Sequence, residues 1–313
     1  MSTLPITVLI AAKNEEINLG RCLAAALTAE RLVVIDSHST DRTAEIAETA
    51  GAEVVQFDYH GGYPKKRQWA LDTLAIQTPW VLLLDADEVV PTALWREIKA
   101  ALSDPRAPEA FLITKGYHFL GRRFRFGGFS HNAVLLVQTG RARFEQMIDE
   151  PDSALDMEVH ERLLIDGRIG KLRTPLVHDD FKGIAAYLDR HNSYSTWEAR
   201  IRHRLRTTGT WGERTIRPAL FGNVQECRRF LKSIAIRIPG EPLLWFAYHY
   251  IFRLGFLEGR AGLIASQIRS AYISQVRAKL YELRCDRRSD CLSKARFSPS
   301  NTDRANGRLR NAA

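Results

Sequence analysis

The sequence predicts an α/β fold, in which a mostly parallel sheet carries helices on both faces and a helical region follows at the C-terminus. Apolar strand-like segments alternate with amphipathic helical ones early in the chain. The most informative apolar run, residues 81–84, ends directly in Asp85-Ala86-Asp87-Glu88. Charge is uneven too: residues 1–199 carry 22 basic and 28 acidic side chains, whereas residues 200–313 carry 23 and 8. The two parts are therefore expected to meet different partners.

The first elements follow from the spacing of apolar residues. Residues 6–11 form an apolar run that predicts a strand. Residues 16–29 place Leu19, Leu23 and Leu27 on one face, which predicts an amphipathic helix. A second strand is expected at residues 32–35.

The next elements are bounded by capping and turn residues. Asp41 caps a helix through residue 49, which Gly51 closes. Strands at 53–57 and 81–84 and helices at 66–76 and around 92–102 complete the alternation. Since Pro79 and Pro91 bound the Val- and Leu-rich fourth strand, it is expected to be central and covered on both faces.

Polar clusters follow three of these strands, at residues 13–16, 36–41 and 85–88. The carboxyl ends of parallel strands meet at one edge, so these clusters are expected to share a rim where ligands bind. Carboxylates there suit a hard divalent cation such as Mg²⁺ or Mn²⁺. The alternative is that residues 85–88 only cap the following helix.

A nucleotide diphosphate fits the rim chemically. The Asp36 carboxylate can accept a hydrogen bond from a base or a ribose. The side chains of Lys65, Lys66 and Arg67 could contact the diphosphate. Each residue also has a purely structural interpretation, as a helix cap or a solvated helix start; only their joint position favours a ligand.

Three segments carry a resemblance to the family 2 glycosyltransferases, which have the GT-A fold. They are Ala12-Lys13-Asn14-Glu15-Glu16, Val34-Ile35-Asp36-Ser37-His38-Ser39-Thr40-Asp41-Arg42-Thr43 and Leu84-Asp85-Ala86-Asp87-Glu88. The resemblance covers roughly the first two hundred residues. One departure is His38, where the family often has Gly; His tolerates a positive φ better than most residues.

The resemblance implies a set of site residues. Those that would hold a nucleotide-sugar are Ala12, Asn14, Glu15, Asp36, Ser37, Asp41, Lys66, Arg67, Asp85 and Ala86. Asp87 and His178 would bind the metal, and Gly127, Gly128 and Trp197 would line the acceptor side. Glu161 is the expected catalytic base, with His160 and Glu158 as the other candidates.

The C-terminal part suggests a membrane surface. Residues 242–257 are dense in aromatic and aliphatic side chains, and Arg253 is the only formal charge among them. The uncharged stretch is too short to span a bilayer, so it is expected to lie at the headgroup boundary or to be a buried helix. The arginines at 200, 202, 204 and 206 are expected on a solvated face.

Composition limits the remaining possibilities. With 313 residues and 45% hydrophobic content, the chain is expected to fold into one large or two modest domains. Its four cysteines, Cys22, Cys227, Cys285 and Cys291, indicate neither a disulfide framework nor a zinc site. No nucleic-acid-binding motif is present. The first residues lack a signal-peptide pattern, so a cytoplasmic location is expected.

The predicted organisation is a GT-A domain at residues 1–205, a membrane-interfacial helical region at 206–283 and a basic disordered tail at 284–313. The implied activity is inverting transfer of a sugar, UDP-hexose being the expected donor, to a lipid-linked or lipopolysaccharide-core acceptor at the inner face of the cytoplasmic membrane. A polyprenyl-phosphate or exopolysaccharide sugar transferase is one alternative. Another is a non-catalytic membrane-binding scaffold.

Overall fold

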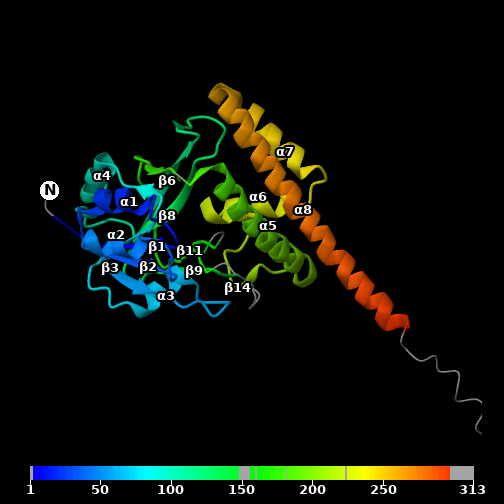
Figure 1. The fold of residues 1–313 in the computed structure, drawn as a ribbon, viewed down its shortest axis with the longest axis horizontal. Coiled ribbons are helices and arrows are strands. Elements are labelled where there is room, and N and C mark those ends of the chain that lie inside the picture. The colour runs from blue at the N-terminus through cyan, green and yellow to red at the C-terminus, as the bar shows by residue number, and fades with distance from the viewer. Residues whose placement is uncertain (1–2, 148–155, 159–160, 181, 223, 297–313) are drawn as a thin grey trace, which may run out of the picture.

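The computed structural model describes residues 3–147, 156–158, 161–180, 182–222 and 224–296. Within these residues, ten strands form one sheet in the order β3-β2-β1-β4-β8-β6-β13-β5, with β7 and β12 paired to β6 (Figure 1). These strands are β1 (Leu4–Ala12), β2 (Ala29–Asp36), β3 (Glu53–Gln56), β4 (Trp80–Asp85), β5 (Glu88–Val89), β6 (Ala110–Phe119), β7 (Arg122–Arg123), β8 (His131–Gln138), β12 (Ile169–Lys171) and β13 (Leu176–His178).

The first half of the sheet is parallel, as the sequence predicts. Strands β3, β2, β1 and β4 run in the same direction, and helices α1 (Leu19–Ala26), α2 (Thr43–Thr49) and α3 (Lys66–Thr73) connect them. Beyond β4, strand β8 is antiparallel to both β4 and β6. The sheet is therefore mixed on this side.

Helices cover both faces of the sheet, which confirms the predicted α/β fold class. Even-numbered residues of β1, such as Val8 and Ile10, pack in one core with α1 and with α4 (Thr92–Leu102). Leu9 packs in the opposite core with α3 and with the small β9–β11 sheet. The small sheets pair β9 (Ala142–Phe144) with β11 (Leu163–Ile165), and β10 (Gln146–Met147) with β14 (Gly212–Arg214).

The predicted elements are all present, with shifted ends. Helix α1 begins at Leu19 rather than Glu16, because the amides of Asn18 and Leu19 first close a turn onto the Glu15 carbonyl, at 3.0 and 2.8 Å. Helix α2 begins at Thr43, whose amide donates to the Asp41 carboxylate at 3.0 Å.

The C-terminal part is helical, and its longest helices pack on each other. It contains α5 (Gly183–Thr208), α6 (Val224–Ala235), α7 (Glu241–Ala247), the π-helix η1 (Tyr248–Phe252), the 3-10 helix η2 (Gly255–Glu258) and α8 (Gly259–Arg296). Ala199 on α5 shares a buried cluster with Tyr272, Ile273 and Val276 on α8. In Figure 1, α8 runs diagonally from the upper part of the molecule away from the sheet.

Two sequence-based expectations fail in this region. The expected tail does not begin at residue 284, because α8 continues to Arg296. Arg202 does not lie on a solvated face: it is 3% exposed, and its guanidinium contacts the carboxylates of Glu198 and Glu241, each at 2.8 Å. The domain boundary expected at residue 205 stays a prediction, and residue 205 lies inside α5.

Candidate functional site

The carboxyl ends of three parallel strands bring the predicted rim together. In the sheet register Ala12 pairs with Asp36, and Ala11 pairs with Asp85. Asp36 is 1% exposed. Its carboxylate accepts hydrogen bonds from the Ser39 amide at 3.0 Å and from the Gln56 side-chain amide at 3.1 Å. Asp36 thus orders the turn after β2 while lying beside Ala12.

The loops after β1 and β2 each contain a residue with positive φ. His38 has a φ of 52°, in the left-handed region that its place in the motif requires. Asn14 has a φ of 53°, and its side-chain oxygen accepts from the Thr40 amide at 2.8 Å. Asp41 accepts from the Glu16 amide at 3.1 Å, so the loops after β1 and β2 are tied together.

Asp85 lies between two basic side chains. Its carboxylate contacts the Arg67 guanidinium on one oxygen and the Lys115 ammonium, at 2.7 Å, on the other. Lys115 also lies 2.5 Å from the Glu88 carboxylate. Glu88 is fully buried and accepts the Asp85 amide at 2.9 Å. Glu88, to which the sequence assigned no role, therefore closes the turn that presents Asp87.

Asp87 and His178 face each other at this rim. His178 pairs with Glu88 across the β13–β5 ladder, and its Nδ1 lies 3.4 Å from Asp87 Oδ1. Burial alone would raise the pKa of Asp87, but His178 outweighs it, so the pKa lies below its ordinary value. Burial alone would lower the pKa of His178, but the nearby Asp87 carboxylate outweighs burial, so the pKa of His178 lies above its ordinary value.

These two side chains fit a divalent cation. Asp87 Oδ1 and His178 Nδ1 are both buried, and neither has a hydrogen-bond partner in the described part of the chain. Those residues hold no group of three or more His, Cys, Asp or Glu side chains placed for a metal. Mg²⁺ commonly takes only one or two carboxylates and completes its shell with substrate phosphates and water, so a site with the single carboxylate of Asp87 is consistent with its chemistry.

The segment that contains the expected base packs on the start of α3. Glu158, one candidate base, is 5% exposed, and its carboxylate accepts the amides of Arg67 and Gln68 at 3.2 and 3.0 Å. Because these are first-turn amides, Glu158 caps α3. His160, the other candidate, lies outside the described residues.

Glu161, the preferred base, forms a buried ion pair. Its carboxylate lies 2.9 Å from the Lys65 ammonium, and both side chains are 4% exposed. The cavity beside them has a volume of about 10 Å³. That is about the room for one water molecule, so an acceptor hydroxyl could reach Glu161 only after a local rearrangement.

The predicted acceptor-side residues lie in different surroundings. Trp197 is 4% exposed in an apolar cluster with Met147 and Trp211, and the Lys65 ammonium lies 5.0 Å from its ring centroid. Its place on the acceptor side stays a prediction, and in this structure the ring is covered. Gly127 and Gly128 have φ values of 82° and 66°, which only glycine adopts readily.

Comparison with known proteins places this geometry in a family. Residues 7–130 match the model of glycosyl transferase family 2. This segment is a family 2 glycosyltransferase domain. The match includes β1, β2 and β4 with the rim at their carboxyl ends, and the parallel order β3-β2-β1-β4 agrees with the GT-A fold that the sequence predicts.

Two curated relatives extend the similarity beyond the transferase domain. The lipopolysaccharide core biosynthesis glycosyltransferase LpsC of Rhizobium meliloti is 26% identical over 208 residues, which cover 63% of this chain and 71% of that protein. A TPR repeat-containing protein of Synechococcus elongatus is 33% identical over 266 residues. That match covers 82% of this chain and 62% of the relative, so the chain spans less than two thirds of its length.

Two solved structures show weaker likeness. Glucosyl-3-phosphoglycerate synthase from Mycobacterium tuberculosis, in complex with Mn²⁺, UDP and glucosyl-3-phosphoglycerate, has a TM-score of 0.30 and 23% identity, covering 37% of this chain and 45% of that one. TarS from S. aureus has a TM-score of 0.42 and 17% identity, covering 88% and 92%. At these scores neither structure adds to the fold assignment.

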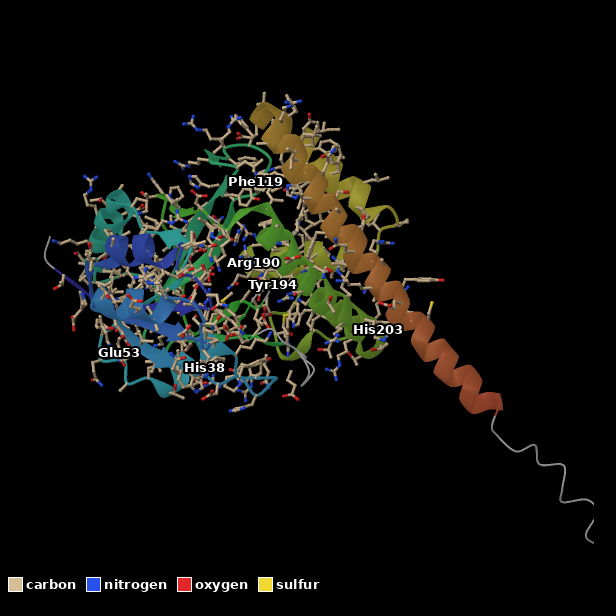
Figure 2. The ribbon with its side chains drawn as sticks, in the orientation of Figure 1. His38, Glu53, Phe119, Arg190, Tyr194 and His203 are labelled. Carbon is tan, nitrogen blue, oxygen red and sulfur yellow. The ribbon has the colours of Figure 1, made fainter. Side chains whose placement is uncertain are left out.

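Several residues at the rim of the transferase domain escaped the sequence interpretation. Lys182 lies 2.6 Å from the Glu15 carboxylate, and Arg190 lies 2.6 Å from that of Asp180. Lys182 lies just before α5 and Arg190 lies within it, and Figure 2 labels Arg190 on the part of α5 nearest the sheet. The only sequence signal for Lys115 is that it is the one Lys, Arg, Asp or Glu in the apolar segment that forms β6.

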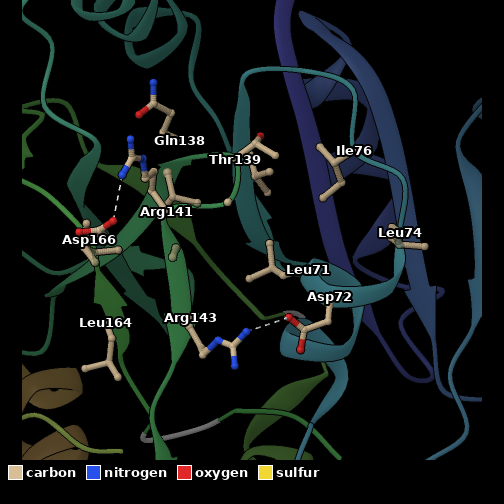
Figure 3. A pocket seen from close by; sticks show the side chains of 15 residues that line it. Leu71, Asp72, Leu74, Ile76, Gln138, Thr139, Arg141, Arg143, Leu164 and Asp166 are labelled. Atoms are coloured by element: carbon tan, nitrogen blue, oxygen red, sulfur yellow. Dashed lines mark hydrogen bonds and ion pairs between the residues drawn. The ribbon is translucent and has the colours of Figure 1, made fainter.

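Another cavity among the described residues lies away from this rim. It has a volume of about 600 Å³ and surrounds Val81, at the amino end of β4, and Gln138, at the carboxyl end of β8 (Figure 3). Its rim carries the ion pairs Arg141–Asp166 and Arg143–Asp72. No predicted site residue lines this cavity, because the transferase rim is at the other end of β4.

Proposed function

We propose that this protein is an inverting, metal-dependent hexosyltransferase. Its donor would be a nucleotide-diphosphate sugar, UDP-hexose, and its acceptor a lipid-linked or lipopolysaccharide-core glycan at the inner face of the cytoplasmic membrane. The observation that carries the proposal is the pair of Asp87 and His178, whose side chains are 13% and 28% exposed and whose buried Oδ1 and Nδ1 atoms lie 3.4 Å apart. The similarity to LpsC supports the class of acceptor.

The donor would lie across the carboxyl ends of β1, β2 and β4. Asp36 and Ser37 would face the nucleoside, with the loops that contain Asn14 and Asp41 shaping the same side. Glu15, Ala12 and Ala86 belong to this rim as well. Arg67 and Lys115 bring positive charge next to Asp85, where the diphosphate would need it.

Asp87 and His178 would hold a divalent cation, Mg²⁺ or Mn²⁺, which when bound would neutralise charge on the departing diphosphate. Lys66 would act indirectly. It is 2% exposed, and its ammonium donates to the Ala12 carbonyl at 2.7 Å and lies 3.2 Å from Asp156, so it fixes the end of β1.

The transfer is a single displacement. The acceptor oxygen forms a bond to the anomeric carbon while the bond from that carbon to the phosphate oxygen breaks, and the nucleoside diphosphate leaves with the bonding electron pair. Glu161 takes the proton of the acceptor hydroxyl. One displacement inverts the anomeric centre, so an α-linked donor gives a β-linked product.

The ion pair with Lys65 sets a condition on this role. Glu161 can receive a proton only if Lys65 moves aside, since the adjoining cavity of about 10 Å³ has no room for a sugar. We propose that acceptor binding separates the pair. Lys65 would then remain near Trp197, whose ring lies 5.0 Å from the ammonium.

The metal assignment is tested by Asp87→Ala. UDP-glucose binding is measured by calorimetry with and without Mn²⁺, and UDP release is measured with core-truncated lipopolysaccharide. We expect Mn²⁺-dependent binding to disappear and kcat/KM to fall by about 10²–10³. Asp166→Ala is the matched control, because Asp166 is exposed at the far end of the domain. Unchanged turnover in Asp87→Ala would rule out the proposed site.

The base is tested separately by Glu161→Gln. We expect kcat to fall by about 10²–10⁴, the usual contribution of a general base, while the Kd for UDP-glucose with Mn²⁺ stays within twofold. If kcat remains at the wild-type value, the base is another group. If a panel of UDP-sugars gives neither binding nor release with the wild-type protein, the scaffold alternative is favoured.

A further inference from the structure

Large apolar side chains are exposed on the elements that precede α8. Leu243 on α7 is 74% exposed and Phe252 on η1 is 76% exposed. Seven more residues of this region and of the segment after β6 are 39–54% exposed: Leu120, Phe126, Leu244, Ile251, Leu254, Phe256 and Leu257. Monomeric proteins seldom leave such an apolar group uncovered without a partner.

Basic residues accompany these side chains. Five arginines in the same segments are exposed, namely Arg122, Arg123, Arg125, Arg253 and Arg260. The acidic residues of residues 119–130 and 241–262, which the structure describes completely, are Glu241 and Glu258, and they are 2% and 4% exposed. The surface formed by the nine apolar residues and five arginines, here called the docking face, is therefore cationic and apolar.

The two segments of the docking face are bonded to each other. Glu258 accepts the amides of Arg125 and Phe126 at 2.7 and 2.9 Å, and Arg122 donates to the Glu258 carbonyl at 3.3 Å. Figure 1 shows the hairpin after β6 beside the upper end of α8, and Phe119, labelled in Figure 2, packs with Ala261 of that helix.

The same contacts hold the glycine loop. The Gly127 amide donates to the Arg253 carbonyl at 2.7 Å, and His249 Nδ1 donates to the Gly127 carbonyl at 2.6 Å. The His249 ring stacks on Phe129, with centroids 4.6 Å apart. A Cβ on Gly128 would lie 2.7 Å from Arg253 Nε. The loop is thus fixed to η1 by both backbone and side-chain contacts.

Two further glycines permit this packing. A Cβ on Gly255 would lie 2.6 Å from the His249 carbonyl oxygen, and one on Gly262 would lie 2.0 Å from that of Gly255. The glycines at 255 and 262 therefore let η1, η2 and α8 approach closely. The docking face is therefore packed closely onto the first turn of α8.

We propose that the docking face binds an anionic lipid bilayer and, through Glu258 and His249, carries the Gly127-Gly128 loop with it. Apolar side chains would enter the acyl boundary while the arginines meet anionic headgroups. A second copy is a poor occupant, because an isologous contact would bring two sets of five arginines together. That the loop lies beside the acceptor rests on the proposed function; the bilayer contact does not.

Vesicle binding tests the surface. The full chain is sedimented with phosphatidylcholine vesicles with or without one quarter phosphatidylglycerol. We expect binding only to the anionic vesicles, weakened at least tenfold in Leu243→Glu/Phe252→Glu and in Arg123→Glu/Arg260→Glu, since each basic residue contributes roughly fivefold. Leu27→Glu and Arg106→Glu are controls, because both residues are exposed in the transferase domain, at 61% for Leu27. Controls that weaken as much as the test variants would overturn the proposal.

Analytical ultracentrifugation tests whether a second copy of the chain, rather than a bilayer, binds the docking face. A wild-type dimer that Leu243→Glu/Phe252→Glu converts to a monomer would assign the face to a second copy and overturn the bilayer proposal. A wild-type monomer supports it. Equal binding to both vesicle types would contradict the role of the arginines.

Hydrogen exchange tests the link to the loop. We expect anionic vesicles to slow exchange of the amides at Arg125, Phe126 and Gly127 at least threefold in the wild type, and to have no effect in Leu243→Glu/Phe252→Glu. Vesicle binding without slower loop exchange would refute the link. UDP release with a delipidated core oligosaccharide separates the two proposals: release without vesicle binding refutes only the docking face, whereas vesicle binding with no release refutes only the transferase.

Discussion

At the scale of single residues, the rim is a set of carboxylates matched by basic side chains from distant parts of the chain. Asp85 meets Arg67 and Lys115, and Asp87 meets His178. The motif residues were predictable, because Asp85 and Asp87 directly follow an apolar strand. Lys115 was not, because it is thirty positions further along and only the pairing of β6 with β8 and β13 brings it beside Asp85.

Lys115→Met tests this balance. Glu88 is fully buried, and without its 2.5 Å partner it would carry a poorly compensated charge. We expect the free energy of unfolding to fall by about 3–5 kcal/mol, measured by urea denaturation. Lys171→Met, on an exposed position of β12, should change it by less than about 0.5 kcal/mol. Adding Glu88→Gln should restore part of the loss; equal stability of Lys115→Met and wild type would contradict this account.

At the scale of elements, the parallel β-α alternation followed from the sequence because each strand and helix has its own period. The roles of the carboxylates around Glu158 could not be predicted in this way. Its two carboxylates looked alike in sequence, yet Glu158 caps α3 and Glu161 pairs with Lys65. The partner of each carboxylate depends on how the strands pack against α3. The local sequence pattern does not specify that packing.

The contact of η1 with the glycine loop predicts a pH dependence. Burial lowers the pKa of His249 to about 4, from an ordinary 6.5. The folded state thus favours the neutral ring, so its stabilising contribution is complete above pH 6.5 and is lost as the pH falls towards 4. From pH 7 to 5 the wild type should lose about 2 kcal/mol from this group.

His249→Asn removes this titration and keeps a donor for the Gly127 carbonyl. Its unfolding free energy should therefore fall less between pH 7 and 5 than that of the wild type, by about 2 kcal/mol, in paired urea titrations at the two pH values. Parallel pH profiles for the two proteins would show that His249 does not titrate as argued.

At the scale of the whole molecule, the transferase sheet and the C-terminal helices share α5 and are joined by buried contacts. Arg202 on α5 pairs with Glu241 at the start of α7, and the Tyr272 hydroxyl on α8 donates to Glu198 at 2.7 Å. No helix among the described residues has a stretch that is both long and apolar enough to cross a bilayer. The basic charge of the sequence indicated where this region lies along the chain. It did not indicate that the region packs on α5.

Truncation tests that attachment. A chain ended after residue 205 keeps Glu198 and Arg202 but loses Glu241 and Tyr272, so we expect it to aggregate or to unfold without a cooperative transition. A chain ended after residue 283 keeps the buried Leu280 and should retain its Tm within about 2 °C. Calorimetry distinguishes them; a stable, cooperative 1–205 chain would make the expected boundary a true domain boundary.

The sequence by itself determined the α/β alternation, the strand that ends in Asp85-Ala86-Asp87 and the family to which that motif belongs, because these are encoded in local periods and short motifs. Only the tertiary structure decided which charges meet. It placed Lys115 beside Asp85, buried Glu161 against Lys65, placed Arg202 in the interior and joined the glycine loop to η1. Such contacts depend on strand order and helix packing, which bring together residues that no local pattern relates.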